Sequence, residues 1–280
     1  MKHPATCEEM LVAVKQLPPL SEVVTKVLLS FEQKNIDVDD IANKINLDSG
    51  MATRILRVAN SAFYGFSNQV GTVHEAVVLL GFHNVRSLVV AAGLIKQFPS
   101  THDQQFDQVA FWRHNIGTGV CARLLANSLG KDGELAFTAG LLHDIGRLVM
   151  AVYCREQFNL VVAQCKQNSI SMLEAEQAVL GMDHGQIGFA ITQRWHFPVA
   201  IQVAIRDHHQ PEKNAEFMSD IVHVANVLCH AMDIGNVDND SVPAISAVVW
   251  ERLGLSWRGI KMLLPEIERQ NAAASLLLND

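Results

Sequence analysis

The sequence predicts an all-α fold, and three observations lead to this class. Of the 280 residues, 49% are hydrophobic and only 6% are aromatic, so a sizeable and mostly aliphatic core is possible. Apolar positions recur at helical spacing through most of the chain. No segment rich in Val, Ile or Thr alternates with a period of two, and no glycine-rich phosphate loop follows a candidate strand. We therefore expect a multi-helical bundle.

The first hundred residues predict a small helical unit, with helices over 18–29, 37–45, 50–60, 74–80 and 83–94. Ser21 and Asp48 are typical N-caps, because their side-chain oxygens can accept hydrogen bonds from the first turn of a helix. Gly81, between the last two of these helices, is a typical C-cap. Residues 63–66 are predicted to form a loop, which the side chains of Asn60 and Ser61 would tie to the backbone.

A polar stretch at 97–105 is the best candidate for a boundary between two helical units. Residues 1–100 would then be an N-terminal helical subdomain, and residues 101–280 a larger helical bundle with C-terminal helices. Because the boundary is short, we expect the two units to pack closely. The helices expected in the second unit cover 106–129, 134–153, 155–168, 171–180, 184–195, 198–208, 216–232, 244–253 and 259–278.

The charge balance argues against bulk nucleic-acid binding. The chain has 22 Lys and Arg residues against 29 Asp and Glu residues, which gives a net charge of −7. An excess of negative charge repels a polyanion and also an anionic membrane surface. We therefore expect neither partner.

The chain is predicted to be a soluble cytoplasmic protein. Its first residues lack the apolar core of a signal peptide. The longest uninterrupted apolar stretch, Leu88 to Ile95, is far shorter than the about 20 residues that span a bilayer. Its five cysteines are scattered and form no Cys-x-x-Cys pair, so they indicate neither a disulfide framework nor a zinc knuckle.

The histidines are the least ordinary feature of the composition, since most of the 12 lie after residue 110. His143 and Asp144 follow a strongly apolar helical turn, where unpaired polar groups would be costly to bury. Bundles can bring side chains from separate helices into one cavity. Imidazoles with a carboxylate suit a divalent transition metal such as Fe, Mn, Ni or Zn, as one or two ions. The remaining candidates on other predicted helices are His114, His184, His208 and His209.

The simpler alternative is a buried, hydrogen-bonded His143–Asp144 pair that serves packing alone. His223 and His230 share a helix face with Asn226 and are expected to be ordinary helix residues near the site. Glu174 and Glu176 lie on the predicted helix before His184. They could support metal ligands by accepting hydrogen bonds, although surface placement is the commoner outcome for glutamates in a helix.

The order of these histidine motifs resembles that of the HD superfamily of metal-dependent phosphohydrolases. Within this superfamily, it is also similar to the order found in the HD-GYP branch. The N-terminal half resembles the HDOD branch of the same superfamily, and together the motifs cover about residues 15 to 230. The segments that carry the HDOD resemblance are Leu17-Pro18-Pro19-Leu20, Leu47-Asp48-Ser49-Gly50, Leu56-Arg57-Val58-Ala59-Asn60-Ser61-Ala62 and Ala76-Val77-Val78-Leu79-Leu80-Gly81. The resemblance implies an HD-type helical bundle.

The resemblance also implies a ligand set for the metal. His114, His143 and Asp144 match the ligands of HD-type enzymes, whereas His184, His208 and His209 match additional ligand positions of two-metal HD-GYP relatives. Asn226 stands where a last aspartate is expected, and is a weaker candidate ligand. Catalytic candidates are His143, Asp144 and Arg147, where Arg147 replaces a lysine of the pattern.

Two further departures concern hydrolysis. Ala110 occupies the position of an acid that bridges two metals, and the Gly-Tyr-Pro loop is absent after His209. Hydrolysis needs an activated water or a metal pair, whereas metal binding alone could survive these changes. We therefore expect a bacterial-type regulatory HDOD protein for signal transduction, with an HD-like metal site and weak or no hydrolase activity.

Two alternatives remain open. The first is an active metal-dependent phosphohydrolase that cleaves a nucleotide or a cyclic dinucleotide, so the sequence leaves open whether the protein is an enzyme. The second is a helical adaptor whose histidines are only structural. The expected partner is a signalling protein or a small ligand that contains phosphate, and the oligomeric state is left open.

Overall fold

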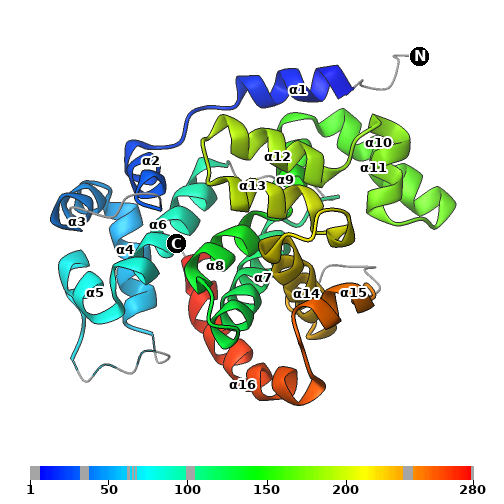
Figure 1. Cartoon of the computed structure of the whole chain (residues 1–280). Coiled ribbons are helices and arrows are strands. Elements are labelled where there is room, and N and C mark those ends of the chain that lie inside the picture. The colour runs from blue at the N-terminus through cyan, green and yellow to red at the C-terminus, as the bar shows by residue number, and fades with distance from the viewer. Residues whose placement is uncertain are drawn as a thin grey trace.

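The chain is mainly helical in the part that the computed structural model describes, which comprises residues 7–31, 38–61, 64, 66, 68–98, 105–235 and 242–278. These residues contain no β-strand, so the predicted all-α class is confirmed (Figure 1). The helices are α1 (Cys7–Gln16), α2 (Glu22–Leu29), α3 (Val38–Leu47), α4 (Ser49–Ala59), α5 (Val73–Leu80), α6 (Phe82–Gln97), α7 (Gln108–Ser128), α8 (Gly133–Leu142), α9 (Ile145–Tyr153), α10 (Arg155–Asn168), α11 (Met172–Leu180), α12 (His184–Arg194), α13 (Val199–Asp207), η1 (Pro211–Lys213), α14 (Phe217–Ala231), α15 (Ala247–Arg252), α16 (Trp257–Ala274) and η2 (Ser275–Leu278).

Several helix ends are set by the residues that the sequence indicated. Ser21 accepts a hydrogen bond from Val24 N and caps α2, and Asp48 accepts one from Met51 N and caps α4. Gly81 ends α5 with a positive φ of 84°. The helix predicted over 18–29 begins only at residue 22, because Ser21 starts it and the two prolines before it lie outside.

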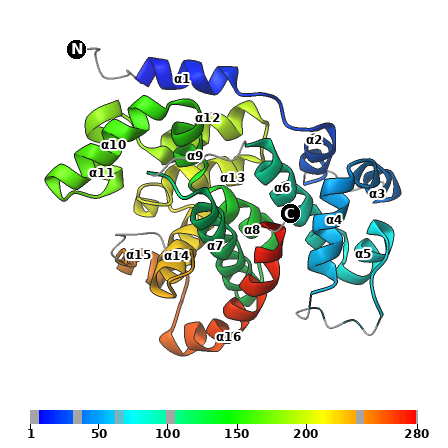
Figure 2. The same ribbon diagram turned by 180° about the vertical axis from the view of Figure 1, so that it is seen from behind.

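The centre of the bundle is formed by α7 and α8, which pack side by side in both views (Figure 1 and Figure 2). Nearly every residue of α7 from Phe111 to Ala126 is buried. A Cβ atom on Gly140 of α8 would lie 2.8 Å from the Cα atom of Gly119 on α7, so the two helices approach as closely as glycine allows. Helices α13, α14 and α16 complete this core around α7 and α8.

The single helix predicted over 134–153 is wrong, because the structure has two helices there. His143 and Asp144 separate α8 from α9, and Asp144 has φ −101° and ψ 13°, outside the helical range. By length and composition the stretch Gly133–Tyr153 could cross a membrane, but 83% of it is buried inside the protein. It is therefore core sequence of the bundle.

Helix α1 was not among the predicted helices. It lies across α12, so the start of the chain packs on the second half of the protein (Figure 1). The C-terminal end of the described chain likewise packs on the first half of the protein, because η2 contacts α4 and α6. Residues 99–104 of the predicted boundary lie outside the described part of the chain, and the division at residue 100 stays a prediction.

Asn60 closes the turn between α4 and α5, in agreement with the sequence. Its amide group donates to Val70 O at 2.9 Å and accepts from Val70 N at 2.7 Å. Ser61 makes no such bond, and its buried hydroxyl has no hydrogen-bond partner in the described structure. Of the predicted loop at 63–66, residues 63 and 65 lie outside the described part.

Candidate metal centre

The histidines predicted as metal ligands come together at the centre of the bundle. Two groups of potential ligand atoms are found, each with all its atoms within 4.8 Å of one another. They share Asp144, so they form one continuous centre. The first group is Asp144, His184, His208 and His209, and the second is His114, His143 and Asp144.

Helix ends supply most of these side chains. His143 follows the last residue of α8, His184 is the first residue of α12, and His208 follows the last residue of α13. Asp144 lies in the break before α9, whereas His114 comes from the middle of α7. Five helices are therefore needed to assemble the centre, which agrees with the bundle sites expected from the sequence.

His143 and His208 are oriented by the same local bond. The Nδ1 atom of His143 lies 2.7 Å from Gly140 O, and that of His208 lies 2.8 Å from Ile205 O. Both carbonyls belong to last helical turns, whose oxygens lack partners within the helix. Because a carbonyl can only accept, Nδ1 carries the hydrogen and Nε2 keeps its lone pair. Neither Nε2 atom has a hydrogen-bond partner in the described residues, as expected of a free ligand atom.

His184 is oriented by a carboxylate instead. Glu176 Oε2 on α11 lies 2.6 Å from His184 Nδ1 and 2.8 Å from His184 N. Surface placement of Glu176 was the commoner expectation and is wrong, since Glu176 is 0% exposed. Its position on the buried face was available in the sequence, because Leu180 follows one helical turn later. Glu174 does lie at the surface, where it forms a capping box with Ser171.

Asp144 is the central anion of the centre. Its Oδ1 atom lies 3.1 Å from His184 Nε2, 3.6 Å from His143 Nε2 and 3.8 Å from His208 Nε2. Its Oδ2 atom accepts a hydrogen bond from Arg147 Nη1 at 2.9 Å. Burial opposes ionisation, but the Arg147 guanidinium and the surrounding imidazoles outweigh it and hold the pKa of Asp144 well below its ordinary range.

His184 differs from its neighbours in protonation. Burial and Arg147 lower its pKa, but the Glu176 and Asp144 carboxylates outweigh them and raise it to about 9. Burial lowers the pKa of His143, His208 and His209, so these imidazoles are neutral. His209 Nε2 lies 2.7 Å from His184 Nε2, and two ring nitrogens this close must share a hydrogen or another cation.

His114 faces a neutral partner. Its Nε2 atom lies 3.0 Å from the Asn226 side-chain oxygen, and burial lowers its pKa to about 3. Its ring lies against those of His143 and His230, with centroids 5.3 Å and 4.6 Å away. Asn226 therefore reaches the centre as the sequence predicted, but it supplies an amide where the family pattern has a carboxylate.

His223 and His230 belong to neither group of potential ligands. The Nδ1 atom of His223 lies 2.9 Å from His208 O, and its Nε2 atom accepts from Ser246 N at 3.1 Å. This side chain holds the segment that carries His208. Ala110 on α7 offers no ligand atom.

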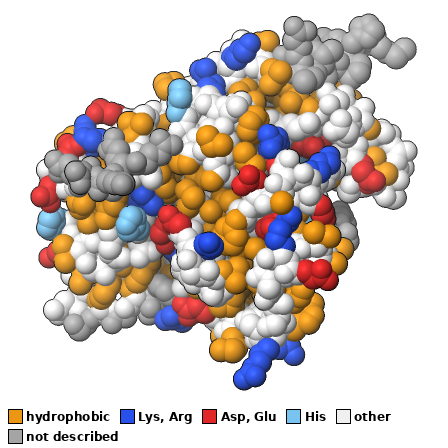
Figure 3. All heavy atoms as spheres, viewed as in Figure 1, with side chains coloured by type: hydrophobic (Ala, Val, Ile, Leu, Met, Phe, Trp, Pro, Cys, Tyr) orange, Lys and Arg blue, Asp and Glu red, His pale blue; other side chains and the backbone are white. Residues whose placement is uncertain are grey.

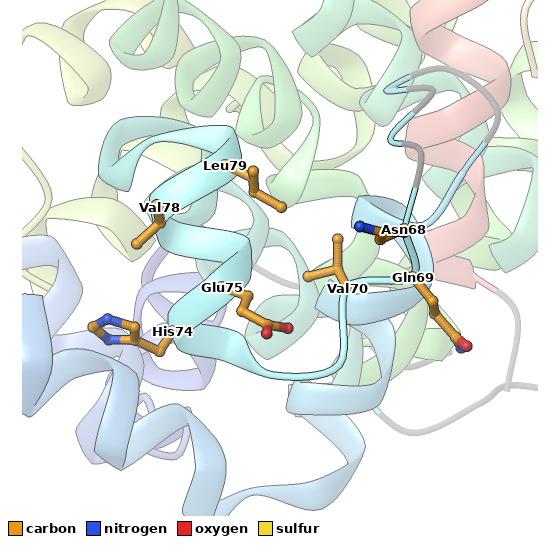
Figure 4. Close-up of a pocket in the computed structure, with 7 residues that line it drawn as sticks. All are labelled: Asn68, Gln69, Val70, His74, Glu75, Val78 and Leu79. Carbon is orange, nitrogen blue, oxygen red and sulfur yellow. The ribbon is translucent and has the colours of Figure 1, made fainter.

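The centre is closed to solvent on most sides. His143 and His184 are 0% exposed, and on the face shown in Figure 3 no histidine appears over α8 or α14. Arg147 and His209 are only partly buried, so access is from their side. A surface pocket of about 300 Å³ lies elsewhere, between α5 and the turn before it (Figure 4).

The donor set fits a divalent transition ion. Neutral imidazoles and a carboxylate are the ligands that such ions prefer. The buried Nε2 atoms of His143 and His208 have no hydrogen-bond partner among the described residues, so their lone pairs are available to an ion. Four-coordinate zinc needs no more ligands than the Asp144, His184, His208 and His209 group contains. The residues present are thus compatible with a metal ion.

Comparison with known proteins identifies the family. The model of the HDOD domain matches residues 17–211, which is more than half of the chain. This protein belongs to the HDOD domain family. The match covers every helix that contributes to the centre except α14, and it confirms the resemblance to the HD superfamily.

Solved structures share the fold of this HDOD protein. A protein of Shewanella amazonensis SB2B, provisionally named a phosphohydrolase, is 25% identical, with a TM-score of 0.79 over 96% of this chain and 97% of the other. An HDOD domain protein of unknown function from Geobacter sulfurreducens is 22% identical, with a TM-score of 0.80 over 96% and 98% of the two chains.

Curated relatives of this HDOD protein are longer. An uncharacterized protein of Treponema pallidum is 26% identical over 237 residues, which are 82% of this chain and 45% of the relative. A protein named ribonuclease Y from Lactobacillus acidophilus is 25% identical over 67% of this chain and 28% of the relative. The chain thus spans less than half the length of these relatives.

Proposed function

We propose that this HDOD protein binds a divalent metal ion in its histidine centre and acts as a cytoplasmic regulatory protein in signal transduction, with weak or no hydrolase activity. It would act through a signalling protein or a small phosphate-containing ligand. The observation that carries the proposal is the group of four potential ligands, Asp144, His184, His208 and His209, which is enough to fill all four positions of a tetrahedral ion. Metal sites in which the protein supplies all four ligands are typical of structural roles, whereas catalytic sites keep an open coordination position.

The charge of the centre supports the same proposal. Asn226 and Ala110 remove two carboxylates that the HD pattern would provide. A bound ion would supply Lewis-acid polarisation of a phosphoryl oxygen. The residues that would hold it belong to the two groups joined by Asp144, and Arg147 beside Asp144 could orient an anionic ligand as a bidentate donor.

The alternative function is a metal-dependent phosphohydrolase. The partly exposed side formed by Arg147 and His209 favours it, because a phosphate could approach the centre there. The provisional name of the Shewanella amazonensis relative also favours it. The relatives named ribonuclease Y make an RNA phosphodiester bond one class of substrate to include in a test.

Metal analysis with an activity panel separates these functions. The protein would be reconstituted with Fe²⁺, Mn²⁺, Ni²⁺ or Zn²⁺ under reducing conditions, and its metal content measured. The panel contains a phosphomonoester, a cyclic dinucleotide and a short oligoribonucleotide. We expect bound metal in the wild type, with turnover no faster than that of the His143→Ala variant. Metal-dependent turnover that His143→Ala abolishes would establish the hydrolase instead, and a wild type that binds no metal would exclude both.

A further inference from the structure

Glu176 is a buried carboxylate with no assigned role. It comes from α11, which supplies none of the potential ligands. Its side chain is 0% exposed, although a lone buried carboxylate is costly. Both of its hydrogen bonds in the described structure go to one residue, since Oε2 accepts from the backbone N–H and from the ring Nδ1–H of His184, while Oε1 lies 3.5 Å from Arg147 Nε. A buried carboxylate that bonds one histidine twice indicates a role at that histidine.

The two bonds fix both the place and the orientation of the imidazole. The backbone bond, 2.8 Å long, holds the first turn of α12, and the ring bond, 2.6 Å long, sets the rotation of the ring. Because Oε2 accepts from Nδ1, Nε2 is directed toward Asp144 Oδ1, 3.1 Å away. In known metal sites a carboxylate on the far nitrogen of a ligating histidine fixes its tautomer and raises its basicity.

Arg147 links Glu176 to the opposite side of the centre. Its Nη1 atom bonds Asp144 Oδ2 at 2.9 Å, and its Nε atom lies 3.5 Å from Glu176 Oε1. The guanidinium therefore lies between the two carboxylates of the centre. Both acids are on the His184 side, whereas the His114 side ends in the neutral Asn226 amide. Both carboxylates that can offset the charge of a bound cation are accordingly near His184, and Arg147 neutralises one of them.

We propose that Glu176 is the positioning residue of this metal centre, which orients His184 and supplies the second negative charge that retains a divalent cation. It acts through His184 and does not itself touch the ion. The proposal rests on the proposed function, because it assumes that the centre binds a metal. It adds a carboxylate from α11 that partly replaces the charge lost at Asn226 and Ala110.

The test compares two substitutions at Glu176 with one at Glu174, using the full chain and Zn²⁺ alone as the probe. Affinity would be measured by competition with a chelator. Glu176→Ala removes both bonds and is expected to weaken Zn²⁺ binding by about 10- to 100-fold. Glu176→Gln keeps an oxygen for His184 but removes the charge, so we expect a smaller loss. Glu174→Gln is the matched control, since Glu174 lies exposed on the same helix, and its affinity should equal that of the wild type.

A spectroscopic readout separates positioning from general stability. Ring ¹⁵N shifts of His184 report which nitrogen carries hydrogen when they are recorded on the metal-free protein above the His184 pKa of about 9, where the ring is neutral. We expect Nδ1–H in the wild type and in Glu176→Gln, and a mixture of tautomers in Glu176→Ala. Because Glu176→Gln is nearly isosteric, it keeps the test open if Glu176→Ala does not fold.

The outcomes distinguish this proposal from the proposed function. Wild-type protein that binds Zn²⁺, together with Glu176 variants that bind it within twofold of the wild type, overturns the role of Glu176 alone. Unchanged His184 tautomers in Glu176→Ala also overturn it. A wild type that binds no metal overturns the proposed function, and with it the metal-dependent part of the role of Glu176.

Discussion

His114 Nε2 lies 3.0 Å from the side-chain oxygen of Asn226, and this hydrogen bond closes the centre on the α14 side. The bond joins two uncharged groups, since burial keeps His114 neutral. A carboxylate at position 226 would occupy nearly the same volume and would add a negative charge to the same partner. This contact is therefore where the charge of the centre can be changed with little disturbance of packing.

The first prediction concerns Asn226→Asp. An added carboxylate next to His114 should strengthen binding of a divalent ion by about tenfold, which corresponds to about 1.4 kcal/mol. Isothermal titration with Mn²⁺ or Zn²⁺ measures this change. Asn226→Ala is the control, because it removes the bond to His114 without adding charge. Equal affinities of Asn226→Asp and the wild type would contradict the prediction.

Removal of the metal should destabilise the protein. An ion that binds only the native state at 100 times its dissociation constant stabilises that state by about 2.7 kcal/mol. We expect a chelator to lower the Tm of reconstituted wild type and to leave that of His208→Ala unchanged. Differential scanning calorimetry with and without the chelator measures both. A wild-type Tm that the chelator does not change would favour the alternative in which the histidines are only structural.

Gly146→Ala should disturb the centre from a distance. A Cβ atom at Gly146 would lie 2.1 Å from His184 O, so α9 and α12 must move apart. Overpacking of this kind costs about 1–3 kcal/mol. We expect lower stability in urea unfolding and weaker Zn²⁺ binding, because His184 shifts. Gly50→Ala serves as the comparison, since the nearest atom to its Cβ is a side-chain oxygen at 3.6 Å; loss of metal affinity in that variant would argue against a local cause.

Asp48 should contribute stability that depends on pH. Burial raises the pKa of this N-cap, but hydrogen bonds from Lys96 and Met51 N outweigh burial and lower the pKa below its ordinary 3.8. A depressed pKa gives stability that is present above the unfolded value and is lost as the pH falls through the folded value. Asn also caps helices, so Asp48→Asn isolates the charge. Its deficit in unfolding free energy should be constant from pH 5 to 7 and shrink below about pH 3.8; a deficit independent of pH would contradict this.

The sequence predicted the elements whose signals are local. Ser21, Asp48 and Gly81 mark helix ends by their own side chain or backbone preference, and the structure has helix ends at all three. The convergence of the histidines was also predictable, because motif order indicated the family and the family implies a bundle. Asn60 behaved as predicted because its bonds reach only to Leu56 and Val70.

What the sequence did not reveal depends on distant contacts. The break at His143 and Asp144 is hidden because both α8 and α9 are buried, so apolar residues continue across it. Residue type alone did not distinguish Glu176 from a surface glutamate, and its spacing from Leu180 was the single local sign of burial. The partner that makes this burial favourable, His184, lies on another helix. Helix α1 packs against α12, which lies far along the chain.

Helix α12 connects two places that the sequence separates. Its first residue, His184, lies in the metal centre, and just beyond its other end the Trp195 indole donates to Pro18 O, while Arg194 donates to Leu17 O. Eleven helical residues span about 16 Å. One short helix therefore joins the metal centre to the Leu17-Pro18 segment, which is where the match to the HDOD domain begins.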